Sequence, residues 1–449
     1  MSDRESRAPE AIQPIERLAS PFVGFAKLEA SGGILLFLCT VLALVWANSP
    51  WWESYHHFWD QPMTVGFGRI LIAETRHFWI DDGLMAIFFF LVGLEIKREV
   101  LIGELSSLKR AAFPLVAAVG GSTVPALLYL LLNQSSGAQR GWGIPMATDI
   151  AFALGLLSLF GNRVPIGLKV FLTALAIVDD LGAVLVIAIF YTSQIRWVGL
   201  VAAALCLGAI ALAGRLGIRS AGVYVLLALG VWAAVFASGI HATVAGVLVA
   251  FLVPVRAQRV PERFLEVAQK RLEELRGAAL TRESMVGDRT QLDAITDLHE
   301  AAGDMRPPAL ALEAELHPTV SFLVLPLFAL FNAGVTIDLP TFRSGLSHPV
   351  GLGVVVGLVL GKQIGVTLFS WLAVRSGRST LPRGVTWPVL YGTACLAGIG
   401  FTMSLFISDL AFTDEALIGL AKVGILCASL IAAIWGTLVL ARRLPASAE

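Results

Sequence analysis

Long apolar runs recur along the chain and are separated by shorter polar connections. Each run has roughly 17 to 25 residues, which is enough for a helix to cross a bilayer of about 30 Å. We therefore predict an all-α membrane protein with about twelve transmembrane helices. The predicted spans lie near residues 31–48, 83–102, 112–133, 143–160, 167–192, 197–214, 221–236, 240–255, 319–335, 350–374, 386–409 and 417–440.

These spans divide the chain into five regions. Residues 1–30 are expected to form a cytoplasmic N-terminal segment, and residues 441–449 a cytoplasmic tail. Helices one to eight occupy 31–255, helices nine to twelve occupy 319–440, and residues 256–318 form a cytoplasmic linker. Lysine and arginine gather in the loops after even-numbered spans, which is the positive-inside pattern. Both termini are thus predicted to be cytoplasmic.

The linker is a long polar segment that interrupts the series of apolar runs. Its stretch PERFLEVAQKRLEELRGAAL is typical of an amphipathic helix, and a looser polar stretch follows it. Two interpretations stay open, a solvated connection or a regulatory or docking segment.

Composition excludes some partners and adds little else. Hydrophobic residues make up 56% of the 449-residue chain, and charged residues make up 15%. The 33 basic and 33 acidic residues balance, so no strongly basic face predicts nucleic-acid binding, and the expected partner is the lipid bilayer. The four cysteines fall in apolar runs without disulfide-like or metal-like spacing, which favours small buried hydrophobic residues.

Two spans are interrupted in the middle. The fourth reads GWGIPMATDIAFALG and the eleventh reads GTACLAGIGFTMSLF, so that glycines, a proline and polar residues interrupt each apolar run. Interrupted helices at corresponding positions of two halves are typical of transporters built from inverted repeats. We expect spans three to five and ten to twelve to be those repeats, with discontinuous helices four and eleven.

Four ionisable residues lie deep within predicted spans, namely Asp149, Asp179, Asp180 and Lys362. A carboxylate in hydrocarbon costs about 3 kcal/mol on insertion scales, so such residues face a bundle interior or a watery cavity and mark function. Three acids and one lysine do not cancel. Neutrality needs about two bound protons, or a bound cation, or a mixture of both.

Adjacent helical residues differ in direction by about 100°. Asp179 and Asp180 therefore cannot point to one place, and one can meet Lys362 while the other turns toward Asp149. Thr148 and carbonyl oxygens freed at a helix break can supply further ligands to a small hard cation. One site that accepts either protons or a cation is suited to exchanging them, although a purely structural packing network is the simpler alternative.

At these residues the sequence closely resembles the NhaA family of bacterial sodium/proton antiporters, whose fold is built from inverted repeats. The resemblance is carried by FFFLVGLEIKREVLIGEL, IPMATDIAFALG, ALAIVDDLGAV, LPLFALFNAGV, GLVLGKQIG and GIGFTMSLFI. It implies twelve helices, with helices four and eleven crossing as unwound segments in a multi-pass protein of the bacterial cytoplasmic (inner) membrane.

The resemblance also implies roles for residues. Asp180 would be the central ligand of Na+ or Li+, with Asp149 at the crossing, Thr148 beside it, and Asp179 paired with Lys362. The implied activity is electrogenic exchange of cytoplasmic sodium for external protons, without a cofactor and switched on at alkaline pH. A homodimer is expected from the resemblance alone.

The pH response of the family is assigned to a cytoplasmic cluster. Its matching residues here are Asp82, Glu95, Glu99, Glu313 and His317, with His241 as a further candidate. Charged residues at helix ends are also common solvated anchors, and a lone histidine is often structural. This chain carries Ala314 where familiar members have a histidine, and its linker is longer, so its pH set-point is open.

Three other classes of membrane protein also use buried charged groups or conduct cations. An intramembrane aspartyl protease needs two opposed carboxylates that share a proton, and no GxGD motif follows an apolar run. A cation channel needs a carbonyl filter or pore loops, which the sequence lacks. A sodium-coupled symporter of an organic solute remains the alternative. The expectation is a transporter and not an enzyme.

Overall fold

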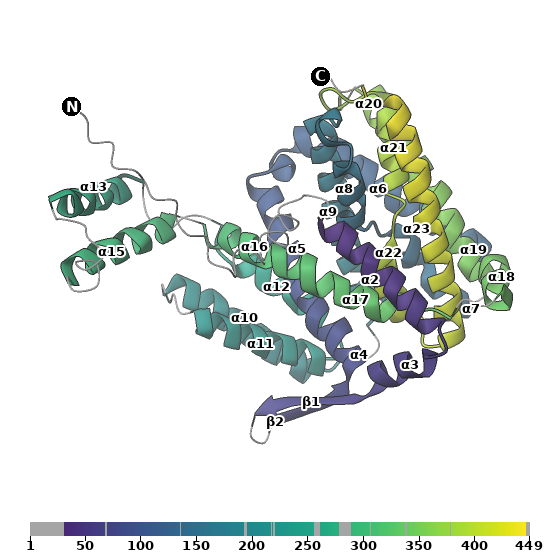
Figure 1. Ribbon diagram of the computed structural model, residues 1–449, viewed down its shortest axis with the longest axis horizontal. Coiled ribbons are helices and arrows are strands. Elements are labelled where there is room, and N and C mark those ends of the chain that lie inside the picture. Colours follow the sequence, from purple (N-terminus) through teal and green to yellow (C-terminus); the bar gives the residue numbers. More distant parts are fainter. Residues whose placement is uncertain are drawn as a thin grey trace, which may run out of the picture.

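Helices make up almost all of the structure, a computed structural model in which most of them form one bundle (Figure 1). It describes residues 31–445 apart from 68–69, 135, 193–194, 217, 219–220, 256–260, 278–288, 306, 337–338 and 378. The predicted segment 1–30 and the end of the predicted tail, 446–449, lie outside the described residues.

Each predicted span coincides with a helix or with an interrupted pair of helices. Among the described residues, seven helices are long and apolar enough to cross a membrane, or up to nine if each bent pair is one span. The other predicted spans are shorter helices. The helices of the first eight spans are α2 (Ser31–Ala47), α5 (Met85–Leu101), α6 (Leu108–Leu132), η3 (Arg140–Met146) with α8 (Ile150–Ser158), α9 (Ile166–Phe190), α10 (Trp197–Arg215), α11 (Ala221–Ala237) and α12 (Thr243–Leu252).

The remaining spans follow the linker. They are α16 (Pro308–Thr319), η5 (Val320–Val324) and α17 (Leu325–Asn332); α19 (Pro349–Val356), η6 (Gly357–Gly361) and α20 (Lys362–Arg375); α21 (Trp387–Leu396) with α22 (Phe401–Ala411); and α23 (Glu415–Arg443). Short helices connect them, namely α3 (Trp52–Asp60), α4 (Arg76–Phe78), η1 (Trp79–Leu84), η2 (Glu104–Ser106), α7 (Ser136–Gln139), η4 (Gly161–Arg163) and α18 (Leu339–Ser347).

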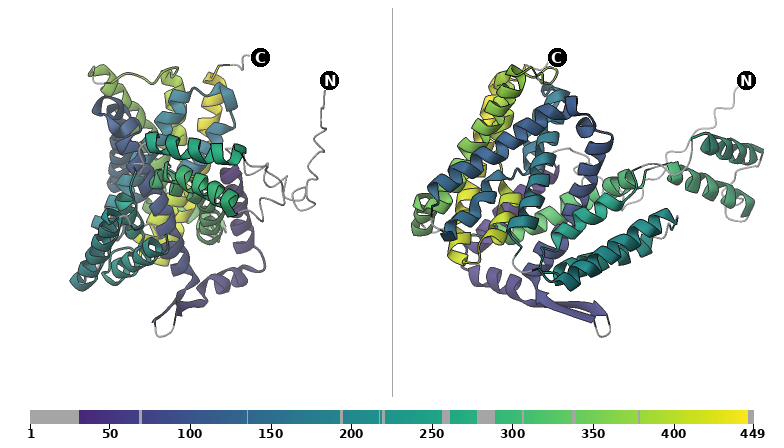
Figure 2. Two further views of the ribbon diagram at one scale, coloured as in Figure 1. Left: turned by 90° about the vertical axis from the view of Figure 1, so that its left-hand side faces the viewer. Right: turned by 180° about the vertical axis from the view of Figure 1, so that it is seen from behind.

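A β-hairpin between the first two spans was not predicted. Strand β1 (Pro62–Phe67) pairs antiparallel with β2 (Ile70–Thr75), and Pro62 lies opposite Thr75. The segment carries several of the β-branched residues that favour a pleated strand. The hairpin projects from one end of the bundle, and the C-terminal end of α23 lies at the other end (Figures 1 and 2). We call the end with the hairpin the hairpin side.

The predicted linker ends earlier than expected. Helix α16 begins at Pro308, so residues assigned to the linker 256–318 continue directly into the ninth span. Proline suits this start because the first turn of a helix has no use for its missing N–H. Glu313 and His317 therefore lie on a membrane helix and not in a loop.

Two amphipathic helices of the linker pack on each other. Helix α13 (Pro261–Gly277) lies beside α15 (Arg289–Met305), away from the main bundle (Figure 2). Arg271 on α13 joins them by an ion pair to Asp297 on α15, and it also pairs with Glu274 on its own helix at 2.6 Å. The expected amphipathic helix is confirmed, and a second one accompanies it.

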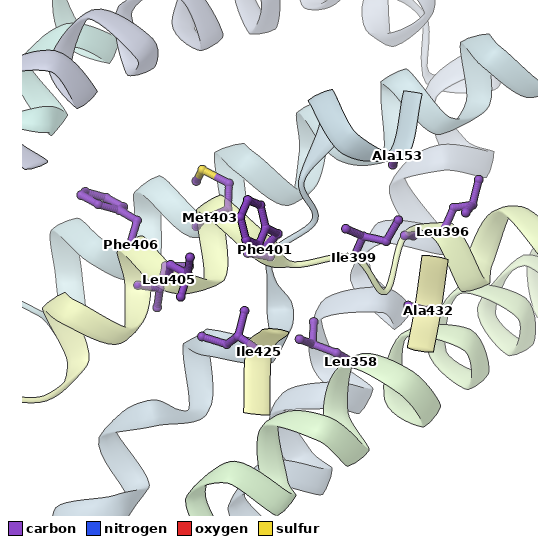
Figure 3. Close-up of a cluster of buried hydrophobic side chains, with 14 of the residues drawn as sticks. Ala153, Leu358, Leu396, Ile399, Phe401, Met403, Leu405, Phe406, Ile425 and Ala432 are labelled. Carbon is purple, nitrogen blue, oxygen red and sulfur yellow. The ribbon is translucent and has the colours of Figure 1, made fainter. Parts of the chain in front are cut away.

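Both predicted helix breaks are present in the bundle core. Residues 147–149 separate η3 from α8, and residues 397–400 separate α21 from α22, whose axes bend by 47°. Apolar side chains surround the second break, including Ile399, Phe401 and Leu358 (Figure 3). The polar groups of the breaks therefore have to find partners inside the protein.

Candidate functional site

The two broken spans cross each other at their breaks. The backbone N–H of Asp149 donates to the carbonyl of Ile399 at 2.6 Å. The hydroxyl of Thr148 lies 2.9 Å from the carbonyl of Ala397, and it shares its single proton between this oxygen and the carboxylate of Asp179. Each break thus satisfies part of the backbone that the other leaves open, which confirms the expectation that helices four and eleven cross as unwound segments.

Asp149 lies between the N-termini of two half-helices. One carboxylate oxygen caps α8 by accepting from the backbone N–H of Phe152 at 3.0 Å. The other accepts from the backbone N–H and the hydroxyl of Thr402, in the first turn of α22, at 3.1 and 2.5 Å. Helix N-termini carry partial positive charge, so both half-helices stabilise an anion at this point.

Three side chains donate hydrogen bonds to the carboxylate of Asp179. Its Oδ2 accepts from Lys362 Nζ at 2.5 Å and from the hydroxyl of Thr148 at 2.8 Å, and its Oδ1 accepts from the hydroxyl of Ser122 at 3.2 Å. The side chains of Asp179 and Lys362 are both fully buried. A buried ion pair is stable only when its remaining polar atoms are also bonded, and here Thr148 and Ser122 provide those bonds.

Lys362 is placed by a local irregularity of its helix. It begins α20 immediately after η6, a single wide turn of π-helix. Such turns insert an extra residue into the helix and occur often at functional sites. The predicted pairing of Lys362 with one of the two adjacent aspartates is present, and the partner is Asp179.

Asp180 has a different environment from its neighbour. It is 2% exposed, and its Oδ1 is buried without a hydrogen-bond partner among the described residues. A buried carboxylate oxygen without a donor costs considerable free energy unless a proton or cation reaches it. The acid is therefore suited to binding one or the other.

The charges of the site leave a deficit of positive charge. Lys362 neutralises Asp179, so Asp149 and Asp180 remain as two buried acids. In the described part of the chain no three His, Cys, Asp or Glu side chains gather as a metal-binding group. A cation here would have to use hydroxyl and carbonyl oxygens besides these acids.

A cavity adjoins this site between α6 and η3. Its volume is about 570 Å³. Its lining residues are Ser122, Thr123, Ala126, Leu127, Leu130, Gln139, Arg140, Trp142 and Met146. Ser122 both lines the cavity and donates to Asp179, so open space lies one side chain away from the buried ion pair.

The structure brings together part of the proposed pH-response cluster. Arg98 pairs with Glu313 at 2.7 Å and with Glu99 at 3.2 Å, so α5 and α16 are joined. Glu95 lies one turn before Glu99 on α5. His317 lies one turn beyond Glu313 on α16, where its Nδ1 is 3.4 Å from the Ser321 hydroxyl.

Asp82 and His241 do not belong to that cluster. Asp82 precedes Glu95 by thirteen residues of helical chain, which is about 20 Å. Its carbonyl accepts from the indole N–H of Trp232 at 2.8 Å. His241 contacts the carbonyl of Tyr191 at 3.2 Å. The expectation of a single cluster that includes Asp82 is wrong, because this length of helix separates Asp82 on η1 from Glu95 on α5.

Two polar residues of the site were not predicted as members. Thr402 is one of the unnamed polar residues that interrupt the eleventh span, and Ser122 gave no signal in an apolar run. Their hydroxyl groups are neutral, so the high cost of charge that singled out the acids does not single them out. The available signal for Thr402 was that it lies at the break of the eleventh span, which corresponds to the break that holds Asp149 in the fourth span.

Comparisons with known proteins agree on one family. A sequence model of the family described as Na+/H+ antiporter 1 matches residues 24–440. The Na(+)/H(+) antiporter NhaA of Koribacter versatilis is 52% identical, over 98% of this chain and 95% of its own. The NhaA of Oleidesulfovibrio alaskensis is 49% identical over 96% and 95%, and that of Rhodopirellula baltica is 44% identical over 99% of each chain. The crossed helix breaks, the buried acids and these matches together place the chain in the NhaA family of Na+/H+ antiporters.

Proposed function

We propose that the protein exchanges Na+ or Li+ for H+, and that cation and protons compete for Asp180 and Asp149. The observation that carries the proposal is the contrast between two adjacent acids. Asp179 has three donors, whereas Asp180 has a buried oxygen without one among the described residues. A free buried carboxylate beside a neutralised one is a place where a proton and a cation exclude each other.

Charge arithmetic supports electrogenic exchange. With Asp179 and Lys362 neutral as a pair, two protons neutralise Asp149 and Asp180, whereas one Na+ leaves one negative charge. The form loaded with protons and the form loaded with Na+ thus differ in charge. A cycle that moves two protons one way and one Na+ the other way therefore moves net charge across the membrane.

The expected orientation places both termini in the cytoplasm of the bacterial inner membrane. In that orientation the hairpin side faces outward, and the cycle releases cytoplasmic Na+ in return for external protons. The Arg98–Glu313–Glu99 cluster lies near the loop predicted to be cytoplasmic, so we assign the alkaline activation to it together with Glu95.

The direct test uses everted membrane vesicles with an acidic interior. Adding Na+ or Li+ should collapse the pH gradient, increasingly so from neutral to alkaline pH. Asp180→Asn should abolish this response in protein that still inserts, because an amide neither ionises nor exchanges a proton. Asp414→Asn, at the exposed cap of α23, is the matched control and should exchange normally.

Two results would contradict the proposal. Normal exchange by Asp180→Asn would remove this acid from its central role. A wild-type gradient that no cation collapses would contradict antiport itself, and Na+ uptake stimulated by an organic solute would then favour a symporter.

A further inference from the structure

A second group of buried polar side chains lies on the hairpin side, away from the crossing. It consists of His77 from α4, Asp81 from η1, Asn332 from α17, Asp409 from α22 and Lys422 from α23. We call it the hairpin-side cluster. Five separate elements meet in it, so it joins parts of the bundle that are distant in sequence.

The cluster forms a continuous chain of contacts. Lys422 Nζ pairs with Asp409 Oδ1 at 3.1 Å and donates to Asn332 Oδ1 at 3.2 Å. The amide of Asn332 donates to Asp81 Oδ1 at 3.0 Å, and Asp81 Oδ2 lies 3.5 Å from His77 Nε2. The chain runs from a side chain that is 48% exposed, His77, to one that is 10% exposed, Asp409.

The charges within the cluster do not cancel. Two carboxylates face one ammonium group, and the side chains of Asp81 and Asp409 are only 8% and 10% exposed. Asp409 Oδ2 is buried without a hydrogen-bond partner among the described residues. A buried surplus charge is costly, so one bound proton completes the cluster.

His77 is where solvent protons reach the cluster. Burial lowers the pKa of His77, and the charge of Lys422 lowers it further, whereas the charges of Asp409 and Asp60 raise it. Outside the cluster, the charge of Asp82 also acts on Asp81. A proton arriving from the hairpin side thus meets the His77–Asp81 contact first, within a surplus of negative charge.

Helix α22 connects this cluster to the crossing. Thr402 in its first turn binds Asp149, and Asp409 in its last turn pairs with Lys422. The two residues are seven apart, which is about 10 Å along the helix. One short rigid helix is therefore held at one end by the cation site and at the other end by the hairpin-side cluster.

We propose that the hairpin-side cluster is a second proton-binding site, which responds to pH on the hairpin side and fixes the far end of α22. With its proton the cluster is neutral and holds α17, α22, α23 and η1 together. When the cluster loses this proton, its surplus negative charge weakens the contacts that hold this end of α22. Its effect on exchange rests on the proposed antiport, but its own proton binding does not.

The first test measures the thermal melting temperature of the purified full-length protein from mildly acidic to alkaline pH. A group that gains a proton on folding stabilises the protein at low pH and loses that contribution as pH rises. Asp409→Asn and Asp81→Asn each leave one acid and one lysine, which need no proton. Both should reduce the alkaline fall in melting temperature, by about 3 °C or more.

Lys422→Met should act in the opposite direction. It leaves two buried acids without an ammonium group, so the alkaline fall should become steeper. Asp414→Asn is the control and should follow the wild type. A downward shift of equal size at every pH in the Asn variants would mean that the cluster is only structural, and that result would overturn the proposal.

The second test measures exchange in right-side-out proteoliposomes while only the external pH changes. Asp409→Asn should shift the external pH that gives half-maximal rate, with the internal pH held constant. An unchanged external pH profile, despite the altered melting curves, would overturn the regulatory part of the proposal. If the wild type shows no exchange at all, the antiport proposal fails, and the melting curves still decide whether the cluster binds a proton.

Discussion

Single residues decide which buried acid is free. Asp179 and Asp180 follow each other on α9, and the rotation of about 100° between them gives one the ion pair and leaves an oxygen of the other without a hydrogen-bond partner among the described residues. Exchanging their roles would require turning the helix. Two adjacent acids are therefore useful because they differ, one holding Lys362 in place and the other left to bind a proton or cation.

A substitution of Thr402 tests whether its hydroxyl helps to keep Asp149 ionised and able to bind a cation. Thr402→Val keeps the shape of the side chain and removes the hydroxyl that donates to Asp149 at 2.5 Å. A hydrogen bond to a charged group contributes about 1.5 to 3 kcal/mol, so protons should compete better against Na+. We expect the Na+ concentration for half-maximal exchange to rise about tenfold. Exchange titrations at fixed pH measure it.

Thr402→Ser is the matched variant, because it restores the hydroxyl. It should behave like the wild type. If both variants need the same Na+ concentration as the wild type, the hydroxyl does not support cation binding and Asp149 depends on backbone donors alone.

The four charged site residues could be predicted because charge in mid-membrane is rare and costly. The hairpin-side cluster was missed for the opposite reason. Asp409 is the last residue of its predicted span, and Lys422 lies near the start of the next, where charged residues are usually solvated. Only the fold shows that these ends are buried against Asp81 and Asn332.

At the scale of elements, the approach of α6 to α20 supports the ion pair. The two helices are in close contact, with Gly120 opposite Gly365. A Cβ on Gly365 would lie 2.1 Å from the carbonyl oxygen of Gly120. Lys362 begins the same helix, so the distance between these backbones helps to set how far its ammonium group reaches toward Asp179.

Gly365→Ala should therefore destabilise the protein. Overpacking of this kind costs about 1 to 3 kcal/mol, because the helices must move apart. The melting temperature should fall by several degrees, and the exchange rate should fall as Lys362 moves. Gly419→Ala is the control, since a Cβ there meets nothing within 4 Å and alanine favours a helix. Equal melting temperatures for the two variants would contradict the close approach.

Some elements could be predicted from the sequence and others could not, for physical reasons. Both helix breaks were predicted, because glycine, proline and buried polar residues interrupt a long apolar run. The start of α16 was not, because its charged residues lower the hydropathy although they do not prevent a helix. Glu313 is retained there by its pairing with Arg98. The hairpin was missed because its six-residue strands carry only a weak periodic signal.

At the scale of the whole molecule, the linker helices lie apart from the membrane bundle. Helices α13 and α15 pack on each other (Figure 2). The backbone N–H of Ala309 donates to the carbonyl of Pro254 at 3.1 Å. The two ends of the linker therefore lie side by side without the help of the segment between them.

Replacing residues 256–306 by a short Gly-Ser connection should leave exchange nearly intact. The membrane helices keep their contacts, and the ends of the deletion already touch. Vesicle exchange rates and pH profiles, compared with the full chain at equal expression, measure the effect. A large loss of rate or a displaced pH profile would assign the linker the docking or regulatory role that its sequence left open.

The crossing of the two breaks also has a genetic consequence. Thr148 and Ala397 bond across 249 positions of sequence, and Asp149 and Thr402 across 253. A substitution that displaces one break leaves backbone groups of the other without partners. Suppressor mutations of mild defects at 147–149 should therefore arise at 397–402, so the two halves of the gene are constrained to evolve together.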